Sequence, residues 1–291
     1  KRVLVGIVLL GITSITAINI HYWVPEAPPP ISAAPLPADF MWGVSSSAFQ
    51  SEGGRIDNNI LRFNDSEPTQ DRYGLSVDFR HRYREDVALA KDLGVNTYRV
   101  GINWARVEPQ PGKYDEVELA YYDDLMLALA QAGIQPLITL DHFSYPGWIA
   151  DCGGWTNPET VTNFVSYVQL IAKRYHSHTH WWITFNEAAM YMAIDIAISR
   201  PGWEGAGKIR KNLISAHRKS YDVIHAVDSL AQVSSNIVWF GDTPMNRLLQ
   251  DLTDWSFLDS ISDKIDYVGI DYYAADLLKG LVTGHHWMWD P

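Results

Sequence analysis

The fold class follows from residues 97–143, which read TYRVGINWARVEPQPGKYDEVELAYYDDLMLALAQAGIQPLITLDHF. The segments at 97–104 and 135–143 are short apolar runs with β-branched and aromatic residues, a composition that favours buried strands. Between them, apolar side chains recur at helical spacing, namely Val117, Ala120, Tyr121, Leu125, Ala128, Leu129 and Ala132. The pattern predicts a helix over Tyr114–Ala132, and Gly133 suits its end. The stretch is therefore typical of a strand–helix–strand unit with two parallel strands.

The same alternation extends along the rest of the chain. Further strand patterns are FMWGVSSSAF from Phe40, WWITFNEA from Trp181, NIVWFGD from Asn236 and DYVGIDYY from Asp266. Another helix begins at Asn157-Pro158, where a capping residue precedes a proline suited to the first turn. Strands that alternate with helices indicate an α/β fold with a parallel sheet, either doubly wound or a (β/α)8 TIM barrel. No glycine-rich phosphate loop is present, which disfavours a nucleotide-binding doubly wound domain.

An apolar segment precedes this α/β part. Residues 3–20, VLVGIVLLGITSITAINI, are about as long as the shortest helix that crosses a bilayer. A secretory signal peptide has a shorter apolar core and a small-residue cleavage site, and no clear A-x-A site follows this run. A retained single transmembrane span, either an anchor or an uncleaved signal, is therefore favoured over a secretory signal peptide. Lys1-Arg2 on one side and Tyr22-Trp23 on the other match a cytoplasmic charge and an interfacial aromatic belt. We therefore expect a membrane anchor over residues 1–24, inserted through residues 3–23, with the globular part outside the cytoplasm (periplasmic, extracellular or lumenal).

A proline-rich segment separates the anchor from the globular part. Residues 25–37, PEAPPPISAAPLP, carry six of the 15 prolines, which predicts a semi-rigid linker over residues 25–38. The remaining domain, residues 39–291, has about the length of a complete barrel. The motifs described below predict instead that it is an incomplete barrel.

Composition narrows the range of partners. Acidic residues outnumber basic ones by 34 to 23, giving a net charge of −11, so nucleic acid is not an expected partner. The single cysteine, Cys152, excludes internal disulfides and cysteine-based zinc sites. The alternating His176, His178 and His180 precede a strand rather than follow one, and we expect a solvated loop there and neither a metal nor a cofactor. Twelve Trp and 15 Tyr suit a carbohydrate-binding cleft, although many of them must simply fill the core.

The carboxyl ends of the predicted strands collect polar and aromatic side chains, where barrels place their catalytic groups. These residues are Gln50, Arg99, Asn103, Trp104, Asp141, His142, Asn186, Glu187, Asp242, Asp271, Tyr272 and Tyr273. Amide, imidazole and carboxylate groups bind hydroxyls, and aromatic faces stack on sugar rings. The predicted site is therefore a sugar pocket.

Several ordered motifs resemble the family 1 glycoside hydrolases, the β-glucosidase and β-galactosidase family. They are FMWGVSSSAFQSEGG (40–54), DFRHRYREDVALAKDLGVNTYRVGINWARVEP (78–109), ITLDHF (138–143), GGWTNPETV (153–161), WWITFNEA (181–188), NLISAH (212–217) and DYVGIDYY (266–273). The resemblance implies a (β/α)8 barrel and hydrolysis of β-glycosides with retention of configuration. That chemistry uses one carboxyl group as acid/base and a second as nucleophile, roughly 5–5.5 Å apart.

The resemblance also assigns roles to individual residues. It implies that Glu187 is the acid/base, and that Arg99 and Tyr273 orient and stabilise the nucleophile. Gln50, His142 and Asn186 correspond to residues that bind sugar hydroxyls. A carboxyl group acting as acid near neutral pH needs a raised pKa, from burial or from a neighbouring carboxylate.

The nucleophile of the family is a glutamate at the end of the seventh strand, and no glutamate follows Tyr273 in this sequence. We therefore expect about six of eight barrel strands, and no turnover by the isolated chain. Three explanations remain open: a fragment of a longer chain, a second polypeptide that completes the barrel, or a non-catalytic binding or structural subunit of a membrane complex. Asp271 and Asp141 are poor substitutes for the nucleophile because each is shorter than Glu and stands on a different strand.

Overall fold

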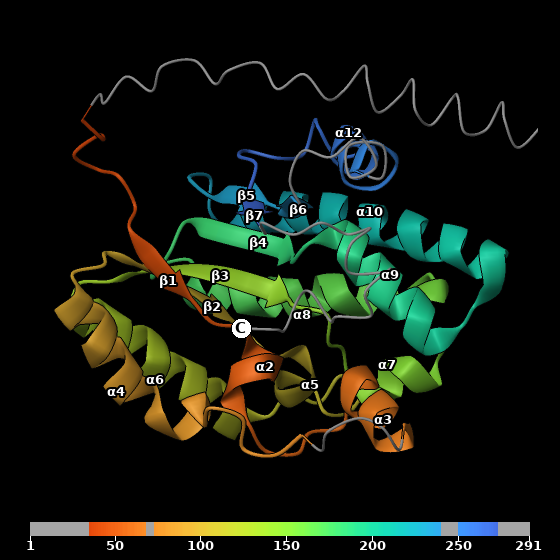
Figure 1. Cartoon of the computed structure of the whole chain (residues 1–291), viewed down its shortest axis with the longest axis horizontal. Helices are drawn as coiled ribbons and strands as arrows, with labels where there is room; N and C mark the ends of the chain where they lie inside the picture. The colour runs from red at the N-terminus through yellow and green to blue at the C-terminus, as the bar shows by residue number, and fades with distance from the viewer. Residues whose placement is uncertain (1–34, 68–72, 240–249, 273–291) are drawn as a thin grey trace, which may run out of the picture. The chain divides into compact units, whose positions relative to one another are not determined.

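The computed structural model describes residues 35–67, 73–239 and 250–272 (Figure 1). It contains two compact units. The larger comprises Met41–Ile237 and Phe257–Asp271, and it holds the predicted site residues that the structure describes, except Tyr272, which belongs to the smaller unit. Tyr273 and Asp242 lie outside the described residues, as does the linker up to residue 34. In the smaller unit, Trp239 packs edge-on against Trp255 with ring centroids 6.4 Å apart.

A five-stranded parallel sheet organises the larger unit. Its strands are β1 (Gly43–Ser45), β2 (Thr97–Gly101), β3 (Gln135–Asp141), β4 (Trp181–Phe185) and β5 (Gln232–Ser234). They lie side by side in chain order, each parallel to the next (Figure 1). A doubly wound sheet reverses its strand order at a switch point, whereas successive barrel strands do not. The order therefore favours the barrel over the doubly wound alternative.

Helices connect the successive strands. They are α2 (Ala48–Glu52), α3 (Asn59–Ser66), α4 (Phe79–Leu93), α5 (Trp104–Val107), α6 (Glu116–Ala132), α7 (Gly147–Asp151), the 3-10 turn η1 (Gly154–Thr156), α8 (Glu159–Tyr175), α9 (Ala188–Ser199) and α10 (Gly202–Val227). After β5 come β6 (Ile237–Trp239), the π-helical turn η2 (Asp251–Trp255), α12 (Ser256–Asp259) and β7 (Ile270–Tyr272). None of the helices in the described ranges is long and apolar enough to cross a membrane. The predicted anchor at residues 3–23 lies outside those ranges.

The two predicted helices are confirmed. The Asn157 side chain accepts a hydrogen bond from the Glu159 N–H (3.0 Å) at the start of α8, and Gly133 ends α6 with a φ of 74° that favours glycine. In α6, however, Val117 is 72% exposed, whereas the fully buried side chains include Leu119 and Tyr122. The apolar residues of this helix lie on all its sides, so their spacing predicted a helix without showing which side faces the core.

The last two predicted strands differ from the structure. The pattern from Asn236 was expected to be the fifth strand, but the strand that pairs with β4 is Gln232–Ser234. Residues Ile237–Trp239 instead form a separate two-stranded sheet with β7, which is shorter than the pattern from Asp266. The segment QVS is short and has a single apolar residue, so its strand character comes from pairing with β4 rather than from its own composition.

Candidate active site

The predicted site residues gather at the carboxyl end of the parallel sheet. Arg99 lies within β2, His142 directly follows β3, and Asn186 and Glu187 directly follow β4. Gln50 lies in α2, just after β1. Because the strands are parallel and adjacent, these ends share one edge of the sheet.

Asn186 is the centre of a hydrogen-bond network. Its Oδ1 accepts from the Arg99 guanidinium and from Nδ2 of Asn236 (3.2 Å). Nε of Arg99 also donates to Oγ1 of Thr139 (2.9 Å) on β3. The network thus joins three neighbouring strand ends and sets the orientation of both Arg99 and Asn186.

Asp271 brings a carboxylate to the same network. Its Oδ1 lies 3.5 Å from Nη1 of Arg99, and its Oδ2 accepts from Nδ2 of Asn236. Asn236 was not among the predicted site residues, although it opens a predicted strand. A signal for it could have been its position beside a strand end, but only the fold shows that its amide contacts both Asn186 and Asp271.

Glu187 occupies a left-handed turn between β4 and α9. Its φ of 44° and ψ of 63° are unusual for a residue other than glycine, and such conformations cost on the order of 1–3 kcal/mol. Asn236 compensates for this strain, because its Oδ1 accepts from the Glu187 N–H (3.2 Å) and its carbonyl accepts from the Ala188 N–H (3.3 Å). The residue is only 4% exposed, so the turn presents a buried carboxyl side chain at the strand end.

His142 is a neutral imidazole at ordinary pH. Burial, aided by the positive charge of Arg99, lowers its pKa to about 3. A neutral ring has one nitrogen that donates a hydrogen bond and one that accepts. It can therefore donate a hydrogen bond to a hydroxyl group or accept one from it.

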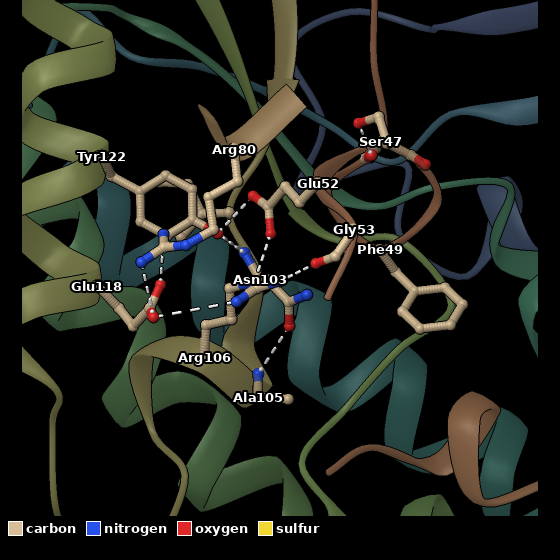
Figure 2. A network of polar contacts seen from close by, with 12 residues as sticks. Ser47, Phe49, Glu52, Gly53, Arg80, Asn103, Ala105, Arg106, Glu118 and Tyr122 are labelled. Carbon is tan, nitrogen blue, oxygen red and sulfur yellow. Dashed lines mark hydrogen bonds and ion pairs between the residues drawn. The ribbon is translucent and has the colours of Figure 1, made fainter. Parts of the chain in front are cut away.

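Gln50 is exposed, and its Oε1 accepts from Oγ of Ser47 (2.7 Å). A buried ionic network, shown in Figure 2, holds the helix on which it stands. Two residues after Gln50, Glu52 accepts from Nε of Arg106 (2.8 Å) and from the hydroxyl of Tyr122 (2.7 Å). These contacts tie α2 to α5 and α6, so the helix that carries Gln50 has a fixed base.

The ionic network continues from Arg106 to two half-buried side chains, on α6 and α4. Nη1 of Arg106 lies 3.9 Å from Oε1 of Glu118, which pairs in turn with Arg80 (2.7 Å) (Figure 2). Burial raises the pKa of Glu52 to about 7, although Arg106 opposes that shift. Desolvation therefore outweighs even a direct arginine contact.

Comparison with known proteins identifies the family. The model of "Glycosyl hydrolase family 1" matches residues 32–254. The chain belongs to this family. It is 29% identical to Beta-glucosidase A of Acetivibrio thermocellus over 86% of this chain and 57% of that protein, and 34% identical to Beta-glucosidase 25 of Oryza sativa subsp. japonica over 59% of this chain and 37% of that protein. A solved β-glycosidase from Pyrococcus horikoshii matches with a TM-score of 0.72 and 26% identity, over 82% of this chain and 63% of that one.

The family 1 chain thus spans between about a third and 57% of the length of these curated relatives. Of its predicted site residues, the structure joins Arg99 and Asn186 directly and connects Glu187 to them through Asn236. His142 lies close enough to Arg99 for the guanidinium to influence its pKa. In the described part of the chain, no group of three or more His, Cys, Asp or Glu side chains could hold a metal ion.

Proposed function

We propose that this family 1 chain binds β-linked sugars at the carboxyl end of its sheet, with Glu187 as the acid/base of a retaining β-glycoside hydrolase. The observation that carries the proposal is the buried Glu187 in a strained turn, tied through Asn236 to Asn186 and Arg99. Strained, over-determined turns of this kind are typical of functional sites. The names of the matched relatives, among them two β-glucosidases, support a β-glucoside as the substrate class.

The neighbouring side chains have complementary roles in this proposal. Asn186, His142 and Gln50 hold sugar hydroxyls through amide and imidazole groups. Arg99 supplies positive charge where a retaining mechanism places its second carboxylate, and Tyr273 orients that carboxylate. In the structure Asp271 lies beside Arg99, so we assign it to orienting the guanidinium rather than to attacking the sugar.

Retention of configuration needs two carboxyl groups, and residues 274–291 contain no glutamate. We therefore propose that these 291 residues bind a β-glycoside without hydrolysing it by themselves. A longer chain or a second polypeptide that supplies the nucleophile would complete the reaction.

Two measurements with the 291-residue chain test the proposal. Calorimetric titration with 4-nitrophenyl 1-thio-β-glucoside, a non-hydrolysable analogue, should show saturable binding that Asn186→Ala weakens about tenfold or more, because a direct hydroxyl contact is lost. The matched control, Asn96→Ala, changes the residue directly before β2, at the opposite, amino end of the sheet, and should leave binding unchanged. Absence of binding would overturn the proposal in favour of the non-catalytic structural subunit.

The second measurement concerns turnover. Hydrolysis of 4-nitrophenyl β-glucoside should be undetectable with the 291-residue chain. Hydrolysis that Glu187→Gln abolishes would show that another carboxylate replaces the nucleophile, and Asp271→Asn would then identify whether it is Asp271.

We also propose that residues 3–23 anchor the chain in a membrane, with the sheet outside the cytoplasm. The support is the length of the uncharged apolar run and the flanking Lys1-Arg2. Expressed in cells, the chain should remain in the membrane pellet after alkaline carbonate extraction, and deletion of residues 3–23 should release it. Release of the undeleted chain would contradict the proposal.

A further inference from the structure

Two carboxyl groups are buried beside the site, and among the described residues neither forms an ion pair. Asp141 ends β3 directly before His142, and Asp195 lies in α9; each is 2% exposed. A buried carboxyl group that lacks a cation must be hydrogen-bonded or neutral, and its presence calls for a physical reason.

Tyrosine hydroxyls bind both carboxyl groups. The hydroxyl of Tyr191 donates to Oδ2 of Asp141 (3.0 Å), and the hydroxyl of Tyr145 donates to Oδ1 of Asp195 (2.6 Å). Nε1 of Trp155 donates to the Tyr191 hydroxyl (2.7 Å), which sets the direction of the first bond. Both aspartates are therefore held without a basic residue.

The two aspartate–tyrosine hydrogen bonds connect the same two segments of the chain. Asp141 and Tyr145 belong to β3 and the loop that follows it, whereas Tyr191 and Asp195 belong to α9. Tyr191 and Asp195 are four residues apart, so they lie on one face of the helix. Each segment contributes one aspartate and one tyrosine, which makes the pair of bonds a two-point attachment.

These segments carry the two sides of the site. The loop after β3 begins with His142, and α9 begins directly after Glu187, whose carbonyl accepts the Tyr191 N–H (2.8 Å). The first bond thus originates one residue before His142, and its tyrosine is one helical turn from Glu187. Rotation of α9 relative to β3 would break both bonds.

Burial favours the neutral form of both carboxyl groups, for Asp195 at pH values below about 6. Burial raises the pKa of Asp195 to about 6 and that of Asp141 well above its ordinary value, and the proximity of Asp195 contributes to the second shift. The titratable groups that face Asp141 are Tyr191, Tyr145, Tyr167 and Asp195, and the nearest cation on the neighbouring strand, Arg99, acts on His142. The buried tyrosines keep their protons, because burial raises their pKa values as well.

We propose that the Asp141–Tyr191 and Tyr145–Asp195 bonds form a positioning device that holds His142 in place relative to Glu187. The four side chains are buried and bond to one another in pairs, so we assign them a positioning role. The proposal rests on the proposed function only in that the two positioned residues bind and process the sugar.

The test compares substitutions in the device with the same substitution elsewhere. Tyr191→Phe removes one bond and should weaken binding of 4-nitrophenyl 1-thio-β-glucoside about tenfold, the typical effect of one lost hydrogen bond near a site. The control is Tyr83→Phe, which breaks another tyrosine–aspartate bond, to Asp124, away from the sheet edge and should leave binding unchanged. Asp141→Ala should act like Tyr191→Phe, and Asp141→Asn should retain binding within about twofold because an amide still accepts the Tyr191 hydrogen bond.

The imidazole resonances of His142, measured by NMR without ligand, separate this proposal from the proposed function. They should move in Tyr191→Phe and Asp141→Ala, and remain in place in Tyr83→Phe and Asp141→Asn. If the wild-type chain binds no glucoside but these resonances respond as described, the positioning device stands and the proposed function fails. Unchanged His142 resonances and unchanged affinity in folded Tyr191→Phe would overturn the device.

Discussion

Two buried acidic networks adjoin the site, and they differ in what opposes their carboxyl groups. The Glu52 network contains two arginines, Arg106 and Arg80, and ties α2 to α4, α5 and α6. Asp141 and Asp195 are hydrogen-bonded to tyrosines instead, and these bonds connect β3 and the loop that follows it to α9. Burial raises the acid pKa values in both networks, so the arginine does not by itself restore an ordinary pKa.

The two networks therefore share the direction of their pKa shifts and differ in what happens when a carboxyl group loses its partner. A carboxylate that loses its arginine remains as an uncompensated buried charge or must bind a proton. A neutral acid that loses a tyrosine hydroxyl loses one hydrogen bond. The first loss should affect the stability of the whole unit, and the second mainly the relative position of two segments.

Loss of an arginine from the Glu52 network should change the free energy of unfolding the most. Arg106→Met should lower the free energy of unfolding by about 3–5 kcal/mol, because it leaves Glu52 buried without its main cation. Urea denaturation measures this change. The control, Arg55→Met, breaks the exposed pair with Asp65 and should leave the free energy of unfolding nearly unchanged. Equal losses in the two variants would contradict the distinction.

A pH series tests the network in which tyrosines bind the two aspartates. Asp195 has a pKa of about 6 in the folded chain against an ordinary value of 3.8, so between these values the folded state holds a proton that the unfolded chain has released. The stabilisation is complete below pH 3.8 and is lost as the pH rises through 6. Relative to Asp195→Asn, wild type should therefore lose up to ~3 kcal/mol of unfolding free energy over this interval.

The measurement is urea unfolding of both proteins at several pH values across that interval, so that titrations common to both cancel. Asp259→Asn, at an exposed position, should follow the wild-type curve. A constant difference between wild type and Asp195→Asn would show that Asp195 does not titrate in this way.

Substitutions of Asp141 should change the free energy of unfolding the least. Since its pKa is raised well above the ordinary value of 3.8, Asp141→Asn at pH 4 replaces one neutral group by another and should cost less than about 1 kcal/mol. Asp141→Ala should cost about 1–3 kcal/mol in the same urea experiment, because the buried Tyr191 hydroxyl loses its acceptor. If the two variants were equally destabilised, the negative charge of Asp141 would be required.

Sequence reasoning identified His142, Asn186 and Glu187 because each comes just after an apolar strand, and Arg99, which lies within β2, through the family motif around it. It missed Asn236, which lies between two strands that are too short and weakly patterned to be separated by composition. It also gave no role to Tyr191 and Asp195, since a tyrosine and an aspartate within an apolar helix have no pattern that indicates their partners. Tyr273 and the anchor remain predictions, because they lie outside the described residues.

The alternation of strands and helices, the resemblance to the family and most of the residues at the strand ends could be predicted without the structure. These features depend on local periodicity and on motifs, both of which are carried by neighbouring residues. The folded chain was needed to show that QVS is the fifth strand, that Asn236 connects Glu187 to Asn186, and that two tyrosines hold two aspartates across β3 and α9. Those hydrogen bonds join residues 49 or 50 positions apart in the chain, and their energies depend on burial that exists only after the chain has folded.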